Sequence, residues 1–263
     1  MDVYWLEQSE ADVPAPDDWF SESEVAQLGR FRFAKRRADW RLGRWTAKRA
    51  VAASLKLADD RPSLKRIEIS AASTGQPEVT LVGRTERVTI SISHRNGVAI
   101  CAVAVGNVQL GCDLEVIESR SDDFVSDYFT AEEQVTIAQM NLEQRPALVT
   151  LLWSAKESAL KALHVGLRAD TRSVRVEIRD PQSHWFKSVA TPTSQTDIRI
   201  SSTDVLSEWR PLQVRCEDDT VLHGWWQCRK DTVRTMVAAP PPGMPMELRP
   251  HDVDRRTRAT ILS

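Results

Sequence analysis

The residues best suited to chemistry are two carboxylates in the segment Gly111-Cys112-Asp113-Leu114-Glu115. Side chains alternate along a strand, so Asp113 and Glu115 would point to one side while Cys112 and Leu114 point into the core. Neighbouring carboxylates repel each other unless they share a cation, and Mg²⁺ prefers a few carboxylate oxygens together with substrate phosphate. The spacing therefore predicts a metal site. The alternative is two exposed carboxylates on a solvated strand.

A second group lies in the helical segment 153–161. Glu157 and Lys161 are four residues apart and share a helical face. Glu157 could be a third metal ligand or a general base, while Lys156 and Lys161 could hold phosphate oxygens. The alternative is a surface Glu–Lys ion pair, which stabilises a helix by only about 0.3–0.5 kcal/mol.

Ser93 and His94 end a predicted strand just before the Asn96-Gly97 turn. A hydroxyl and an imidazole at this point could both donate hydrogen bonds to a phosphate. The alternative is an ordinary surface histidine.

The small net charge of -2 conceals strong segregation. Residues 1–27 carry eight acidic and no basic side chains, residues 28–50 carry nine basic side chains against one Asp, and residues 113–133 carry eight acidic side chains against one Arg. Blocks of this kind often mark sites for charged ligands or metals. The balance excludes a general nucleic-acid binder, because no basic surplus or recognisable binding motif is present.

The basic block predicts one long helix, or a bend followed by a helix, over Phe31–Leu57. Its cations Arg37, Arg41, Arg44 and Lys48 recur at helical spacing on one face. This stripe has no acidic partners one turn away, so its charge is uncompensated locally. The alternative is a solvated helix face.

The remaining helices and strands are predicted from the spacing of apolar residues and from the turn-forming residues between them. Strands are predicted at 67–70, 88–93, 98–105 and 110–116, with an Asn-Gly hairpin turn between the second and third. A capping box at Thr130 opens a helix to about Leu142, and a helix over Leu148–His164 closes at Gly166. Further strands are predicted at 173–178, 185–190, 197–201, 213–216, 221–228 and 233–239.

A faint internal repeat joins the two helical regions. Trp45-Thr46-Ala47-Lys48 resembles Trp153-Ser154-Ala155-Lys156, 108 residues later, and each helix precedes a β region that ends in an apolar hairpin. We therefore expect an α+β fold, a pseudo-twofold duplication of a helix plus an antiparallel sheet. The predicted parts are an N-terminal half over 1–109, a C-terminal half over 110–239, and a Pro-rich linker and tail over 240–263.

The order of these motifs along the chain resembles that of the 4′-phosphopantetheinyl transferases of the surfactin-synthetase-activating type. The motifs are the basic helix, Gly75-Gln76-Pro77, Ser93-His94, the Asp113/Glu115 strand and the Lys156–Lys161 helix. The resemblance covers roughly residues 31–239. It implies transfer of phosphopantetheine from coenzyme A to a serine of an acyl or peptidyl carrier protein, with release of adenosine 3′,5′-bisphosphate. It also implies a cleft between two α+β units as the site.

The resemblance assigns roles to individual residues. Asp113, Glu115 and Glu157 would bind Mg²⁺, or Mn²⁺ in its place, and Glu157 would deprotonate the carrier serine. Coenzyme A, the co-substrate, would contact a set of nine residues: Arg37, Arg44, Gly75, Gln76, Pro77, Ser93, His94, Lys156 and Lys161. Gln76 departs from the family, which often has lysine there, so this loop has lost a charge.

Two other functions compete with the transferase. One is a non-catalytic module that binds coenzyme A or a carrier protein on the same fold, and the other is a nucleic-acid binder that uses the basic helix. The longest apolar run is too short to span a bilayer, and the acidic start lacks the apolar core of a signal peptide. We expect a cytoplasmic monomer without a membrane or nucleic-acid partner. The four Cys lack metal-binding spacing and are expected to be buried reduced thiols.

Overall fold

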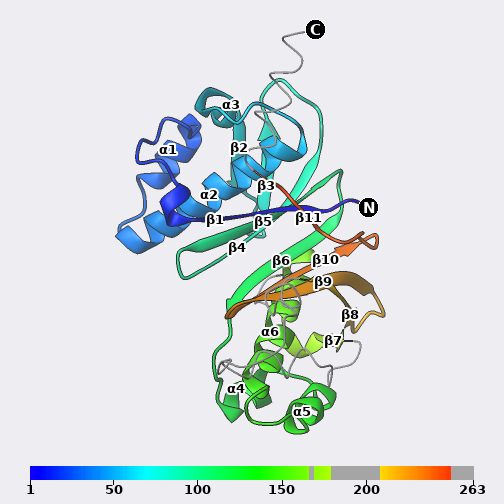
Figure 1. The fold of residues 1–263 in the computed structure, drawn as a ribbon. Coiled ribbons are helices and arrows are strands. Elements are labelled where there is room, and N and C mark those ends of the chain that lie inside the picture. The colour runs from blue at the N-terminus through cyan, green and yellow to red at the C-terminus, as the bar shows by residue number, and fades with distance from the viewer. Residues whose placement is uncertain (166–168, 179–207, 250–263) are drawn as a thin grey trace, which may run out of the picture.

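Two helix-and-sheet units follow each other along the chain in the computed structural model, which describes residues 1–165, 169–178 and 208–249 (Figure 1). The first unit contains β1 (Tyr4–Ser9), α1 (Glu22–Leu28), α2 (Ala34–Ser54), α3 (Arg61–Lys65), β2 (Ile67–Ala71), β3 (Pro77–Leu81), β4 (Val88–Arg95) and β5 (Val98–Val105). The second contains β6 (Gln109–Val116), α4 (Asp122–Tyr128), α5 (Ala131–Ala138), α6 (Arg145–Ala162), β7 (Val174–Ile178), β8 (Arg210–Cys216), β9 (Val221–Arg229) and β10 (Thr232–Ala239). The short β11 (Met246–Glu247) follows. The expected α+β duplication is confirmed.

Each unit packs one long helix on a sheet. In the first, α2 lies on the sheet of order β11-β1-β5-β4, and β2 and β3 form a separate hairpin. In the second, α6 lies on the antiparallel sheet of order β6-β10-β9-β8-β7. The β4–β5 hairpin turns at Asn96 and Gly97, both with positive φ, as the Asn-Gly sequence predicts.

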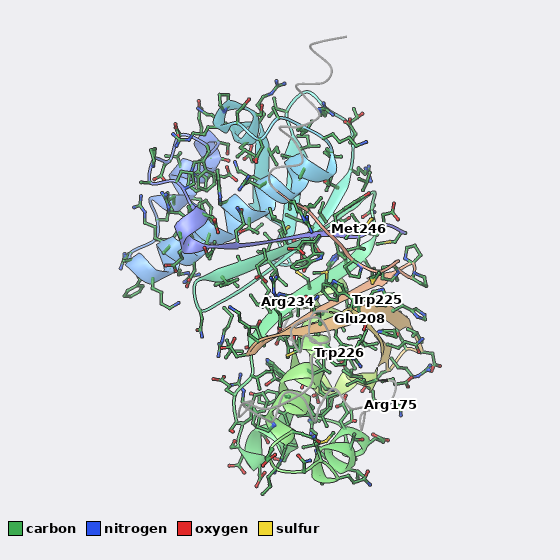
Figure 2. The ribbon with its side chains drawn as sticks, viewed as in Figure 1. Arg175, Glu208, Trp225, Trp226, Arg234 and Met246 are labelled. Carbon is green, nitrogen blue, oxygen red and sulfur yellow. The ribbon has the colours of Figure 1, made fainter. Side chains whose placement is uncertain are left out.

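The two sheets meet through their edge strands, β4 and β6. The Cys112 backbone N–H donates to Ser91 Oγ across this junction at 2.9 Å. An apolar cluster fills the space behind it, in which Trp5 of β1 meets Trp209 edge-on. Arg234 of β10, labelled near the middle of Figure 2, donates from Nε to Glu7 of β1 at 2.6 Å. The units therefore share one continuous interior.

Gly111 sets how closely α6 approaches β6. A Cβ at this position would overlap the carbonyl oxygen of Ser158 on α6. Thr235 of β10 fixes the helix from the next strand, because its Oγ1 lies 2.7 Å from Ser158 Oγ and 2.9 Å from Ser154 Oγ. The helix residues that follow, up to Lys161, are thus held against β6.

The segment after β10 differs from the predicted linker. Residues 240–249 return to the first unit, where β11 pairs in parallel with β1 (Figure 1). Met246 N–H donates to the Val3 carbonyl and Leu248 N–H to the Trp5 carbonyl. These ten residues belong to the fold, and a two-residue strand has no period by which a sequence could reveal it.

Other predictions have mixed outcomes. The predicted helices and strands that lie within the described residues agree with α2, α5, α6, β2 and β4 to β10 apart from their ends. The elements β1, β3, α1, α3 and α4 were not predicted. The predicted strands at 185–190 and 197–201 and the stop at Gly166 lie outside the described residues. No helix within the described ranges is both long and apolar enough to span a bilayer. All four Cys are buried free thiols, as expected.

Candidate active site

The two carboxylates of β6 stand at the junction of the units. Alternation along β6 buries Cys112 and Leu114 in the core and turns Asp113 and Glu115 toward the end of β4. Asp113 Oδ1 accepts hydrogen bonds from Ser93 Oγ of β4 and from Lys161 Nζ of α6, each at 2.8 Å. The site therefore draws one side chain from each of three elements.

Glu157 completes this group from α6, one turn before Lys161. Burial, then the charge of Asp113, raises the pKa of Glu157 to about 7, although Lys161 opposes the shift. The pKa of Glu115 is also raised, mainly by burial and then by Asp113, against the lowering effect of Arg95 and Arg120. Negative charge on neighbouring carboxylates thus adds to burial in raising the pKa values of Glu115 and Glu157.

Each of these carboxylates keeps one buried oxygen without a hydrogen-bond partner among the described residues. The atoms are Asp113 Oδ2, Glu115 Oε2 and Glu157 Oε1. Buried carboxylate oxygens are normally hydrogen-bonded, so each of these three atoms can still accept a hydrogen bond or contact a cation.

These oxygens do not form a finished coordination shell. Within residues 1–165, 169–178 and 208–249, no three His, Cys, Asp or Glu side chains are grouped so that they could hold a metal ion. Mg²⁺ is usually bound by one or two carboxylates plus waters and substrate phosphates, and does not need an all-protein cage. The donor chemistry therefore fits Mg²⁺, while the three-ligand set is not assembled as it stands.

His94 lies near the end of β4, beside α2. Its Nε2 is 3.9 Å from Asp39 Oδ2, and Asp39 is in turn paired with Lys35 at 3.0 Å. Burial, opposed by Asp39 and supported by Lys161 and Lys35, lowers the pKa of His94. Lys35 is thus a cation of α2 whose charge acts on His94, and it was not among the predicted site residues.

A cavity of about 540 Å³ opens between the β3–β4 region and α6. Gly75, Gln76 and Pro77 line it, and Lys161 lines its α6 side. Arg87 and His164 also line it and were not predicted. Because Lys161 also binds Asp113, this one side chain joins the cavity to the carboxylates.

Lys156 does not reach this cavity. Its ammonium is completely buried, lies 2.8 Å from Glu133 Oε2, and donates to the carbonyls of Thr171 and Val174. The prediction that it holds a phosphate is wrong in this geometry, because its direction on α6 is away from the cleft and its donors are already used.

Arg37 and Arg44 are not among the residues that line the cavity either. Arg37 faces Asp17 at 3.5 Å, and Arg41 pairs with the same carboxylate. Arg44 lies over the Trp40 ring at 4.8 Å. The acidic first segment therefore compensates much of the stripe, which the sequence presented as unpaired, because the partners come from 20 or more residues upstream.

A comparison with known protein families finds a similarity over part of the chain. The model of the 4′-phosphopantetheinyl transferase superfamily matches residues 109–214, a span that contains Asp113, Glu115, Glu157 and Lys161. This part of the chain is therefore similar to the superfamily, in agreement with the resemblance seen in its motifs. No curated protein matches the chain.

Among solved structures, the holo-[acyl-carrier-protein] synthase of Helicobacter pylori, in complex with coenzyme A, matches 40% of this chain and 99% of its own at 22% identity and a TM-score of 0.33. The corresponding synthase of Bacillus anthracis matches 40% and 94% at 18% identity and a TM-score of 0.36. That of Neisseria meningitidis matches 40% and 98% at 15% identity and a TM-score of 0.34.

Proposed function

We propose that the chain transfers 4′-phosphopantetheine from coenzyme A to a serine of an acyl or peptidyl carrier protein and releases adenosine 3′,5′-bisphosphate. The observation that carries this proposal is Glu157, a half-buried carboxylate on the same face of α6 as Lys161, whose buried Oε1 has no hydrogen-bond partner among the described residues and whose pKa is raised by burial and by the charge of Asp113. A general base works best when its pKa is near the operating pH.

The cavity beside α6 is where coenzyme A would bind. Gly75, Gln76 and Pro77 would contact one end of the molecule, and the Lys161 ammonium would donate to its pyrophosphate. Burial opposes the charge of Lys161, but Asp113 and other negative neighbours raise its pKa overall, so it stays a cation. Ser93 and His94 would face the phosphates from the end of β4.

Asp113, Glu115 and Glu157 are the residues that would hold Mg²⁺, or Mn²⁺ in its place, through the three unpartnered oxygens. When bound, the ion supplies charge neutralisation for the pyrophosphate and for the leaving bisphosphate. Proton transfer and binding of the phosphate oxygens would fall to Glu157 and Lys161.

In the reaction, Glu157 accepts the proton of the carrier serine hydroxyl, which is a poor nucleophile until that proton is removed. The serine oxygen then bonds to the phosphorus that carries the pantetheine, and the bond from that phosphorus to the bridging oxygen breaks. The electron pair leaves with adenosine 3′,5′-bisphosphate, while Lys161 holds a phosphate oxygen in place.

The test is the mass of an apo carrier protein after incubation with the full chain, coenzyme A and Mg²⁺. We expect the gain of one phosphopantetheine with wild type and none with Asp113→Ala, whose fold is checked by circular dichroism. Glu217→Ala, in the exposed β8–β9 turn, is the matched control and should transfer normally. Tight binding of coenzyme A with no transfer to any of several unrelated carriers would instead favour a non-catalytic binding module.

A further inference from the structure

Two arginines flank the Glu115 carboxylate, outside the set of residues assigned to catalysis. Arg95 ends β4, and Arg120 follows β6. Arg95 Nε lies 3.4 Å and Arg120 Nη2 4.0 Å from Glu115 Oε2. The Glu115 side chain is 14% exposed, so these charges are only partly screened.

Neither arginine completes a hydrogen bond to that oxygen. Glu115 Oε2 and Arg95 Nε are both buried without a hydrogen-bond partner in the described part of the chain. Their attraction is therefore coulombic and lacks the directional strength of a charge-assisted hydrogen bond.

Glu118 holds the same arginines more firmly. Its Oε1 lies 3.0 Å from Arg95 Nη2 and 2.7 Å from Arg120 Nη2. Arg120 also lies over the Phe124 ring at 5.1 Å. The two guanidinium groups thus keep their positions through Glu118 and Phe124, whether or not Glu115 remains beside them.

We propose that Arg95 and Arg120 form a latch on Glu115 that competes with the divalent cation for this carboxylate, and that Glu118 retains the arginines when Glu115 turns to the metal. The inference rests on the proposed function, because it takes Glu115 as a metal ligand. It agrees with the absence, in the described ranges, of a ready group of three metal-binding side chains. Arg95 and Arg120 are positioning residues in this scheme.

The latch predicts that the metal alone binds weakly. Glu115 must leave two cations, and Asp113 must share its charge with Lys161. A polyphosphate that arrives with the metal adds oxygen ligands and negative charge, which offset this competition.

The test is the affinity of the full chain for Mn²⁺ without coenzyme A, measured by calorimetry or by electron paramagnetic resonance of the free ion. Arg95→Gln should bind Mn²⁺ about two- to fivefold more tightly than wild type, the scale of a partly exposed ion pair. Arg120→Gln is the second variant and should act in the same direction. Arg84→Gln removes an exposed arginine paired with Glu86, and should leave the affinity unchanged.

A double-mutant cycle separates contact from a general field effect. In a Glu115→Gln background the latch has no charge to hold, so Arg95→Gln should no longer change the Mn²⁺ affinity. An equal gain in both backgrounds, or no gain in either arginine variant, overturns the latch. Modification of a carrier protein by the wild-type chain, assayed with Mg²⁺, tests the proposed function separately. If transfer is normal but the arginine variants gain no Mn²⁺ affinity, the latch alone is rejected. If no carrier is modified, the proposed function is rejected.

Discussion

Lys156 Nζ lies 2.8 Å from Glu133 Oε2, and the two side chains are 0% and 4% exposed. The first unit repeats this relationship with Lys48 and Glu24, 2.5 Å apart and equally buried. Each glutamate closes the capping box of a short helix and accepts a backbone N–H from the strand beyond, Ile69 in one unit and Val176 in the other. The duplicated motif is therefore a buried strut that ties helix, helix and strand together.

Breaking the strut should destabilise the fold. Lys156→Met leaves the Glu133 carboxylate buried without its cation, which typically costs about 3–5 kcal/mol. We expect a lower midpoint in urea unfolding, and partial recovery in the double variant Lys156→Met/Glu133→Gln. Loss of coenzyme A affinity at unchanged stability would return Lys156 to the phosphate site.

Glu157→Gln should lose transfer while the protein stays folded. The substitution keeps the shape and removes the proton acceptor, and a general base typically contributes about 10²–10⁴-fold to rate. The measurement is the initial rate of carrier modification at saturating coenzyme A, with binding of coenzyme A measured in parallel. A rate within about tenfold of wild type would assign the base to another group.

Lys35 should matter more than Arg37 for coenzyme A. Each cation has an acidic partner, Asp39 for Lys35 and Asp17 for Arg37, but the charge of Lys35 also acts on His94, a predicted phosphate contact. We expect Lys35→Gln to weaken binding by about fivefold, the upper scale of an exposed charge contact, and Arg37→Gln by less. Coenzyme A that lacks the 3′-phosphate provides the control, since its affinity should not respond to Lys35. The reverse order of effects would restore the basic stripe as the phosphate contact.

Gly111→Ala should displace α6. The added methyl would meet the Ser158 carbonyl, which belongs to helix backbone and cannot rotate away. We expect a loss of stability above about 4 kcal/mol, or a protein that fails to accumulate. Gly29→Ala is the comparison, because a Cβ there meets only ordinary contacts at 3.6 Å or more. A stable Gly111→Ala protein with normal transfer would contradict the close packing of α6 on β6.

Alkaline pH should destabilise the protein through its buried thiols. Burial raises the pKa of Cys228 from 9.0 to about 12. A group with a raised folded-state pKa stabilises the fold below its unfolded pKa, and this contribution is lost as pH rises from about 9 to about 12, at up to about 1.4 kcal/mol per pH unit. The fall in stability between pH 8.5 and 10.5 should therefore be shallower in Cys228→Ala than in wild type. Parallel curves would show that this thiol ionises as easily in the fold as outside it.

Sequence patterns predicted the parts of the site that depend on local geometry. Alternation along 111–115 is enough to bring Asp113 and Glu115 to one side, and helical spacing links Glu157 to Lys161. Asn96-Gly97 predicts the hairpin turn that follows His94 and Arg95. These features need only the geometry of a strand, a helix turn and a tight turn.

The features that escaped prediction depend on long-range partners. Lys156 looks like a solvated helix residue until Glu133, on another helix, is known to face it. A signal did exist, because Phe20-Ser21-x-x-Glu24 recurs as Phe129-Thr130-x-x-Glu133 at an offset of 109 residues. The basic stripe looked unpaired because Asp17, its main partner, lies far upstream of the helix.

Equivalent positions of the two struts have diverged in the residue that follows each lysine. After Lys48 comes Arg49, which is bound to Asp59, and after Lys156 comes Glu157. In the first unit this position thus forms a salt bridge, and in the second unit it holds the proposed proton acceptor. The strut of the first unit is therefore an internal control for the strut of the second. The same substitution at Lys48 and at Lys156 perturbs equivalent struts, but only the strut of Lys156 lies next to the proposed active site. Any difference in transfer between two equally destabilised variants would measure how tightly the reaction is coupled to its supporting helix.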